Sequence, residues 1–119
     1  MSASIILDPV SPDTAIVAGP AGTIATNAAA FSYSGSDNLT PAGSLAYAVY
    51  LQGYDSGWSA FSTSTTRLYS FLPNGSYTFQ VKTKDLAGNE DPTPAARSFT
   101  IAGTNLRKTF LPVILRANP

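Results

Sequence analysis

Acidic residues and asparagines supply the oxygen atoms with which this chain could bind a cation. Asp85, Asn89 and Asp91 lie close together in the sequence, and Asp37 sits in an earlier run of turn-forming residues. Calcium takes about six to eight oxygen ligands from carboxylates, amide groups and backbone carbonyls, so these four residues are candidate calcium ligands. The alternative is turn chemistry, in which the same side chains bond nearby backbone groups. We favour the turn interpretation and keep calcium as the alternative cofactor.

Three aromatic residues near the middle of the chain could form a platform for a sugar ring. Trp58 follows the turn sequence GYDSG, and Tyr50 and Tyr54 lie just before it. The alternative for Trp58 is a structural role in the core or over a sheet, because a large aromatic side chain typically buries about 150 to 250 Å². We favour packing for Trp58, with carbohydrate binding on these three aromatics as the alternative.

The composition excludes several classes of function. The sequence contains neither His nor Cys, which removes histidine-dependent triads, disulfide bonds and the usual zinc ligands. So short a chain offers no pair of carboxylates flanked by a cleft-forming insertion, as a glycosidase would need. All seven acidic residues lie within residues 1–103, together with only four of the seven basic residues. The missing catalytic groups predict a noncatalytic protein. Because nucleic-acid binding needs clustered Lys and Arg, we also predict that the protein does not bind nucleic acid.

The clearest structural signal is the alternation of side chains from Tyr77 to Lys84. Tyr77, Phe79 and Val81 share one face, whereas Lys82 and Lys84 lie on the other. This period of two predicts a strand with one buried and one solvated side, and makes Tyr77, Phe79 and Val81 structural residues.

Six further segments have the same character and are separated by Gly, Pro, Asn and Ser. The expected strands are Thr14 to Ala18, Ala29 to Tyr33, Leu45 to Leu51, Trp58 to Phe61, Thr66 to Phe71 and Arg97 to Ala102. About seven short strands without a sustained helical period predict an all-β sandwich of two antiparallel sheets.

The ordered motifs resemble a known family. The sequences PDTAIVAGPAGT, AAFSYSGSDN, YLQGYDSGWSAF, LPNGSYTFQVKTKDLAGNEDPTP and RSFTI occur in this order between Pro12 and Ile101. This set is similar to the bacterial Ig-like domains of secreted and cell-surface proteins, which are related in shape to fibronectin type III. The resemblance implies an Ig-like or fibronectin III-like sandwich, and Tyr77 resembles the tyrosine corner of such folds, whose phenol bonds an upstream backbone group. In that connectivity Asp37, Asp85 and Asp91 would meet at one pole.

The chain divides into three expected regions. Residues 1–12 are an N-terminal linker or extra strand, residues 13–103 are the Ig-like domain, and residues 104–119 are a C-terminal tail that forms an edge strand or an anchor. The tail carries the apolar cluster Phe110 to Leu115, which contains Pro112 and is flanked by basic residues. No apolar run approaches the roughly 18 residues of a transmembrane segment.

Together these features predict an accessory module of a larger secreted or cell-surface bacterial protein. Its expected roles are spacing, stability or attachment, and its expected partners are neighbouring domains of the parent protein and, as an alternative, cell-wall material or polysaccharide. Fold alone does not assign an activity.

Overall fold

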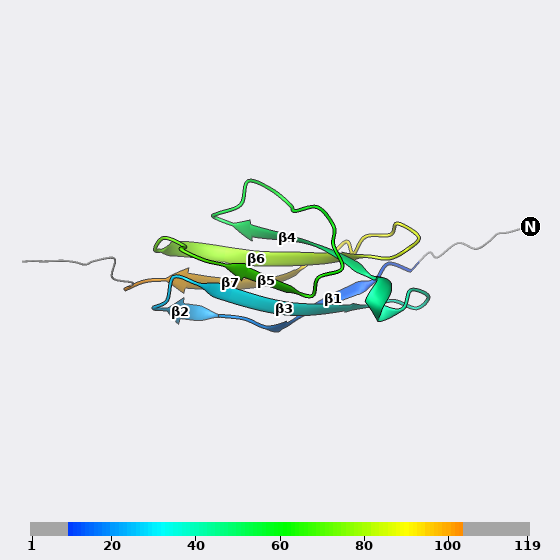
Figure 1. Cartoon of the computed structure of the whole chain (residues 1–119), viewed down its shortest axis with the longest axis horizontal. Coiled ribbons are helices and arrows are strands. Elements are labelled where there is room, and N and C mark those ends of the chain that lie inside the picture. Colours follow the sequence, from blue (N-terminus) through cyan, green and yellow to red (C-terminus); the bar gives the residue numbers. More distant parts are fainter. Residues whose placement is uncertain (1–9, 104–119) are drawn as a thin grey trace, which may run out of the picture.

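The computed structural model describes residues 10–103, which form two β-sheets packed face to face (Figure 1). The elements are β1 (Asp13–Ala18), β2 (Gly22–Ile24), β3 (Ala29–Ser36), η1 (Ala42–Ser44), β4 (Ala46–Gln52), β5 (Thr66–Tyr69), β6 (Gly75–Lys84) and β7 (Ala95–Ile101). The expected sandwich of seven strands is therefore present. The expectations for residues 1–9 and for the tail 104–119 lie outside the described residues.

The strands are ordered β1-β3-β5 in one sheet and β2-β7-β6-β4 in the other. Neighbouring strands run antiparallel except for β2 and β7, which are parallel. The expectation of two purely antiparallel sheets therefore needs this correction. β1 ends at Ala18, as expected, but the chain then crosses to the second sheet and continues there as β2.

The crossing between the two sheets occurs at Gly19 and Pro20. Pro20 has no N–H to donate to a ladder, so a regular strand ends there. The guanidinium of Arg97 on β7 donates a hydrogen bond to the Gly19 carbonyl, with Nη1 and O 3.0 Å apart. The ring of Phe31 occupies the space that a Cβ at position 19 would need. Only glycine therefore fits where the chain changes sheets.

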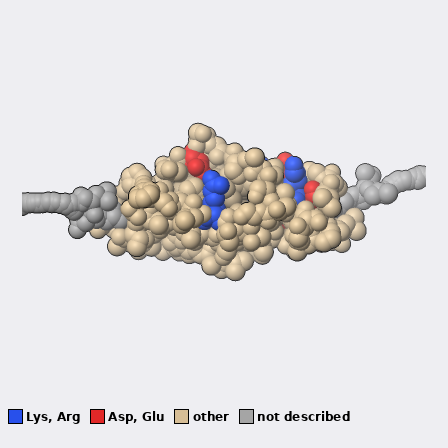
Figure 2. Space-filling view, in the orientation of Figure 1, with Lys and Arg blue, Asp and Glu red and all other residues tan. Residues whose placement is uncertain are grey.

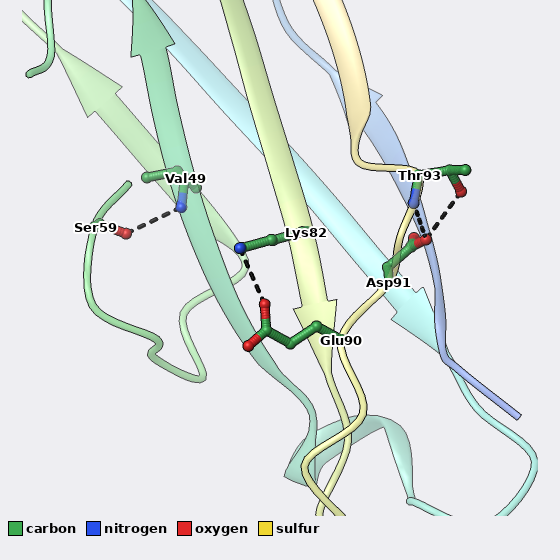
Figure 3. Close-up of polar contacts among 6 residues, drawn as sticks. All are labelled: Val49, Ser59, Lys82, Glu90, Asp91 and Thr93. Atoms are coloured by element: carbon green, nitrogen blue, oxygen red, sulfur yellow. Dashed lines mark hydrogen bonds and ion pairs between the residues drawn. The ribbon is translucent and has the colours of Figure 1, made fainter. Parts of the chain in front are cut away.

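The expected strand from Trp58 to Phe61 is absent. This segment follows the outer edge of β4, where Tyr47 and Ser62 exchange backbone hydrogen bonds of 2.6 and 2.9 Å. Further along, the N–H of Val49 donates to the hydroxyl of Ser59 at 3.0 Å instead of to a backbone carbonyl (Figure 3). The side-chain acceptor interrupts the ladder of backbone hydrogen bonds, so the segment covers the edge of β4 without becoming a strand.

The core lies between the two sheets and is rich in aromatic residues. Tyr77, Phe79 and Val81 on β6 are buried, as their alternation predicts. The other buried apolar residues of the core cluster are Ala29, Phe31, Tyr33, Leu45, Tyr47, Val49, Leu51, Tyr69, Leu72, Phe99 and Ile101. The two sheets are therefore joined by one continuous apolar layer.

The described chain enters and leaves the sandwich at opposite poles (Figure 1). Asp13 at the start of β1 pairs with Ser36 at the end of β3. Ile101 at the end of β7 pairs with Gly75 at the start of β6, which is the other end of the long strand. Among residues 10–103, no helix is long and apolar enough to cross a membrane.

Candidate functional site

The candidate calcium ligands lie at the pole where the described chain begins. Asp85 and Asn89 close the turn after β6. One carboxylate oxygen of Asp85 accepts the Asn89 backbone N–H at 2.8 Å, and the other accepts the Asn89 side-chain amide at 3.1 Å. The backbone N–H of Asp85 donates to the Asn89 carbonyl at 3.0 Å. Both oxygens of this carboxylate therefore serve the turn, as the turn interpretation expects.

Asp91 is buried and joins the β6–β7 loop to β1. Its Oδ2 accepts the Thr14 hydroxyl at 2.7 Å, and its Oδ1 accepts the N–H and the hydroxyl of Thr93, each at 2.9 Å (Figure 3). The Thr14 hydroxyl also lies 2.7 Å from that of Thr83, which is fully buried on β6. The Asp91 carboxylate is thus enclosed by hydroxyl and amide donors.

Asp37 caps the turn that follows β3. Its Oδ2 accepts the N–H groups of Thr40 at 2.9 Å and Leu39 at 3.2 Å. Burial acts to raise the pKa of Asp37, but these hydrogen bonds outweigh it and the pKa is lowered. Its Oδ1 is buried without a hydrogen-bond partner in the described chain.

The acidic side chains at this pole are not gathered into one cluster of carboxylates in the described residues. Within residues 10–103, no group of three or more His, Cys, Asp or Glu side chains is placed to hold a metal ion. Calcium binding by Asp37, Asp85, Asn89 and Asp91 therefore stays a prediction, and it would compete with the hydrogen bonds described above.

Two of the three candidate aromatics meet on the outer face of the four-stranded sheet. The rings of Tyr50 and Trp58 are tilted, with centroids 5.7 Å apart. The Lys82 ammonium lies 4.7 Å from the centre of the Trp58 ring and 3.0 Å from a carboxylate oxygen of Glu90 (Figure 3). Trp58 retains 37% exposure. The indole therefore covers the sheet while Lys82 occupies part of its surface.

The third aromatic, Tyr54, lies elsewhere. Its ring meets that of Tyr69 edge to face, with centroids 6.0 Å apart. Beside this pair, Oδ2 of Asp55 accepts the Tyr69 hydroxyl and the Leu51 N–H, both at 2.9 Å. Burial, followed by the bond to Asp55, raises the pKa of Tyr69 well above its usual range.

Asp55 is a structural residue that the sequence alone does not indicate. The sequence GYDSG reads as a turn, and nothing local indicates that its Asp contacts Tyr69 on β5. The one available signal is that an isolated acid follows the end of a strand, where its carboxylate can accept a hydrogen bond from a backbone N–H of that strand.

Tyr77 forms the contact that the tyrosine-corner resemblance implied. Its hydroxyl donates to the Pro73 carbonyl at 2.6 Å. Burial raises the pKa of the Tyr77 phenol. The bond ties the turn before β6 to the strand itself, which is a structural role.

A hollow of about 520 Å³ lies on the outer face of the four-stranded sheet at the opposite pole. Hydroxyl pairs cross its floor, from Ser76 to Thr100 at 3.3 Å and from Thr78 to Ser98 at 3.0 Å. All its lining residues are uncharged. The polar groups of this hollow are therefore hydroxyls, the Gln52 amide and backbone groups.

Charged side chains are sparse on one broad face of the sandwich (Figure 2). The face in Figure 2 shows Lys, Arg, Asp and Glu only in a few small groups on an otherwise uncharged surface. No continuous basic stripe crosses this face, so it lacks the electrostatic footprint of a nucleic-acid interface.

A family profile matches residues 42–102, from η1 to the end of β7, and its family is described as the Y_Y_Y domain. The chain belongs to the Y_Y_Y domain family. The matched segment contains five of the six tyrosines of the chain and the β4-β6-β7 part of the larger sheet. Comparison with curated proteins gives no match for this Y_Y_Y domain.

Solved structures share the fold of this Y_Y_Y domain at low sequence identity. Fibronectin(III)-like modules of Clostridium thermocellum CbhA match with a TM-score of 0.62 and 14% identity over 85% of this chain and 52% of theirs. The extracellular domain of a candidate hybrid two component system from B. thetaiotaomicron matches with a TM-score of 0.57 and 18% identity, over 93% of this chain and 16% of its own. The extracellular domain of a candidate one component system from the same organism matches with a TM-score of 0.52 and 20% identity, over 69% of this chain and 12% of its own. The Y_Y_Y domain thus spans only part of each of these chains.

Proposed function

We propose that this Y_Y_Y domain is a noncatalytic connecting module of a longer extracellular protein. The observation that carries the proposal is the position of the chain ends. The described chain enters the sandwich at one pole and leaves it at the other (Figure 1), so flanking domains would be held apart by its full length. β6 alone has ten residues, which is about 33 Å of strand.

Two further observations support this role. The charged and hydroxyl groups at the acidic pole are engaged in holding β1, β6 and the β6–β7 loop together. The structurally similar chains from B. thetaiotaomicron are extracellular domains in which this fold accounts for a small share of the length. On this basis the partners are neighbouring domains of the same protein, and the location is secreted or cell-surface.

The alternative is a module that binds carbohydrate on Tyr50 and Trp58. The favourable observation is that the two rings adjoin and Trp58 remains partly exposed. Against it, Lys82 lies over the indole ring, and Tyr54 is directed toward Tyr69 instead of extending the platform. Two adjoining rings, one of them partly covered by Lys82, give little surface for a sugar chain.

Mechanical pulling tests the connecting role. The full chain is held at its two ends between inert handles and extended in a single-molecule instrument. We expect one cooperative unfolding event that releases roughly 300 Å of chain, because the two sheets share a single core. Several small events spread over low force would contradict a module that keeps its neighbours apart.

Trp58 provides the test of the alternative, because it is the only tryptophan in the sequence. Its fluorescence is followed while neutral and acidic oligosaccharides are added, with W58F as the matched control on a glycan array. We expect no saturable change. A saturable change in the original chain, together with glycan-array binding that W58F loses, would establish the carbohydrate-binding alternative.

A further inference from the structure

The outer edge of β5 has no partner strand in the described part of the chain. Only β3 pairs with β5 among residues 10–103. The backbone N–H of Tyr33 on β3 donates to the Thr65 carbonyl at 2.9 Å, and bonded pairs alternate along an antiparallel ladder. By this alternation the N–H and C=O of Leu68 point away from β3. An edge of this kind is a template for another strand.

The edges of β4 and β1 carry protection, whereas on β5 only Thr66 does, through the Ser64 hydroxyl that bonds its N–H and its C=O, so Leu68 is the open position. Ser59 and Ser62 bond the edge of β4. The register of β1 shifts between Ile16 and Ala18, an irregularity that disfavours strand addition.

The surface beside the β5 edge is apolar. Leu68 is 64% exposed, and Phe71, just after the end of β5, is 85% exposed. Phe71 also has a φ of 59°, a left-handed conformation that is unfavourable for a residue with a bulky side chain. An aromatic held in this conformation and left in water points to a contact that the described residues do not supply.

The chain itself carries a segment that fits. Phe110 to Leu115 contains an apolar cluster, FLPVIL. The chain leaves β7 at Ile101, which pairs with Gly75 at the start of β6. β5 ends at Tyr69, a few residues before Gly75, and therefore at the same pole. Residues 104–109 can span about 20 Å when extended, so the cluster can reach β5. A chain turning back from this pole would run antiparallel to β5, which arrives there.

We infer that residues 110–115 add to the free edge of β5 as an antiparallel strand of the same molecule. Pro112 has no N–H and must therefore point away from β5. The N–H groups of Leu111 and Val113 then face β5, and their side chains share the outer face with Leu68. The tail thereby closes the open edge and covers its exposed leucine. This goes beyond the connecting role proposed above and does not depend on it.

Amide hydrogen exchange of Leu68 tests this inference. The full chain is compared with a chain that ends after Gly103, which keeps both sheets. We expect the Leu68 amide to exchange at least tenfold more slowly in the full chain, because its N–H is bonded only when the tail is present. Equal rates within twofold would overturn the inference.

A pair of proline variants tests the register. Val113→Pro removes an N–H that faces β5, so the protection of Leu68 should be lost. Ile114→Pro places the missing N–H on the side already occupied by Pro112, so protection should be retained at least in large part. Loss in both variants, or retention in both, would contradict the proposed pairing.

The same protection could arise from a second copy of the chain. Sedimentation and a tenfold dilution series distinguish the two sources. Protection that is independent of concentration in a monomer supports the intramolecular strand. Protection that falls on dilution as a dimer dissociates would show that the tail binds another molecule, and would overturn the inference.

Discussion

Phe31 on β3 and Phe79 on β6 stack face to face across the two sheets, with ring centroids 3.9 Å apart and planes inclined by 8°. Phe31 also meets Phe99 at 5.7 Å, and Phe79 meets Tyr33 at 6.0 Å and Tyr69 at 6.2 Å. The stack is therefore the centre of an aromatic network that joins both sheets. With no cysteine in the chain, packing of this kind holds the sheets together without a disulfide.

Replacing Phe79 with Ala should lower the free energy of unfolding by about 3 to 5 kcal/mol, because a fully buried ring and its stacking partners are lost. Urea denaturation at neutral pH measures the change. The matched control is Leu86→Ala, since Leu86 is 73% exposed and its loss should change stability by less than about 0.5 kcal/mol. A loss below about 1 kcal/mol in F79A would show that the ring does not occupy the core.

Replacing Gly19 with Ala should destabilise the sandwich by about 1 to 3 kcal/mol, because the added Cβ meets the buried ring of Phe31 where the chain changes sheets. Gly43→Ala is the control, since a Cβ at position 43 in η1 would meet nothing within 4 Å. The two midpoints in urea are compared. Equal stability of the two variants would mean that the Phe31 ring does not fill the space beside Gly19.

Replacing Tyr69 with Phe should cost about 1 kcal/mol at neutral pH, because the hydrogen bond to Asp55 is lost. The substitution should also make the free energy of unfolding depend less steeply on pH in the alkaline range. Burial and Asp55 raise the pKa of Tyr69 in the folded protein above the ordinary value of about 10. The contribution of the Tyr69 hydroxyl to stability is then complete below pH of about 10. It declines as the pH rises toward the pKa of Tyr69 in the folded protein.

Denaturation of both proteins between pH 7 and 11.5 tests this sign. The difference in stability between the original chain and Y69F should shrink above pH of about 10. Tyr33 and Tyr77, whose pKa values are also raised by burial, leave some alkaline dependence in the variant. A difference that grows with pH would contradict the account.

Calcium should leave the melting temperature unchanged. The carboxylates of Asp85 and Asp91 are already hydrogen-bonded within the fold. A ligand at one hundred times its dissociation constant would stabilise the folded state by about 2.7 kcal/mol, which a thermal melt detects readily. Melts with millimolar calcium and with a chelator are compared. A rise of several degrees with calcium would reinstate the acidic pole as a metal site.

The sequence predicts those elements whose signal is local. The strand around Phe79 shows uninterrupted alternation, and the Asp85 to Asn89 turn follows from residues that bond their own backbone. β2 could not be predicted, because it has only three residues and exists through parallel pairing with β7 far along the chain. The segment from Trp58 to Phe61 resembles a strand in the sequence but is not one, because the Ser59 hydroxyl takes the place of a backbone acceptor, a detail that alternation does not reveal.

The candidate site was predicted less completely, for the same reason. The pairing of Tyr50 with Trp58 depends on how the β4–β5 loop folds back over the sheet, and the position of Lys82 over the indole depends on Glu90. Asp55 shows no sequence period at all, since its role is set by the Tyr69 hydroxyl that reaches it across the loop.

The central claim is that the module holds its two ends apart, and a distance between spin labels tests it most directly. The chain has no native cysteine, so Val10→Cys and Ala102→Cys place one label at each pole. Val10→Cys with Asn38→Cys is the control pair within one pole, because β1 begins beside the end of β3. We expect a narrow distribution near roughly 35 Å for the first pair, about the length of β6, and roughly half that or less for the second. Equal short distances for both pairs would place the two ends at the same pole and contradict the connecting role.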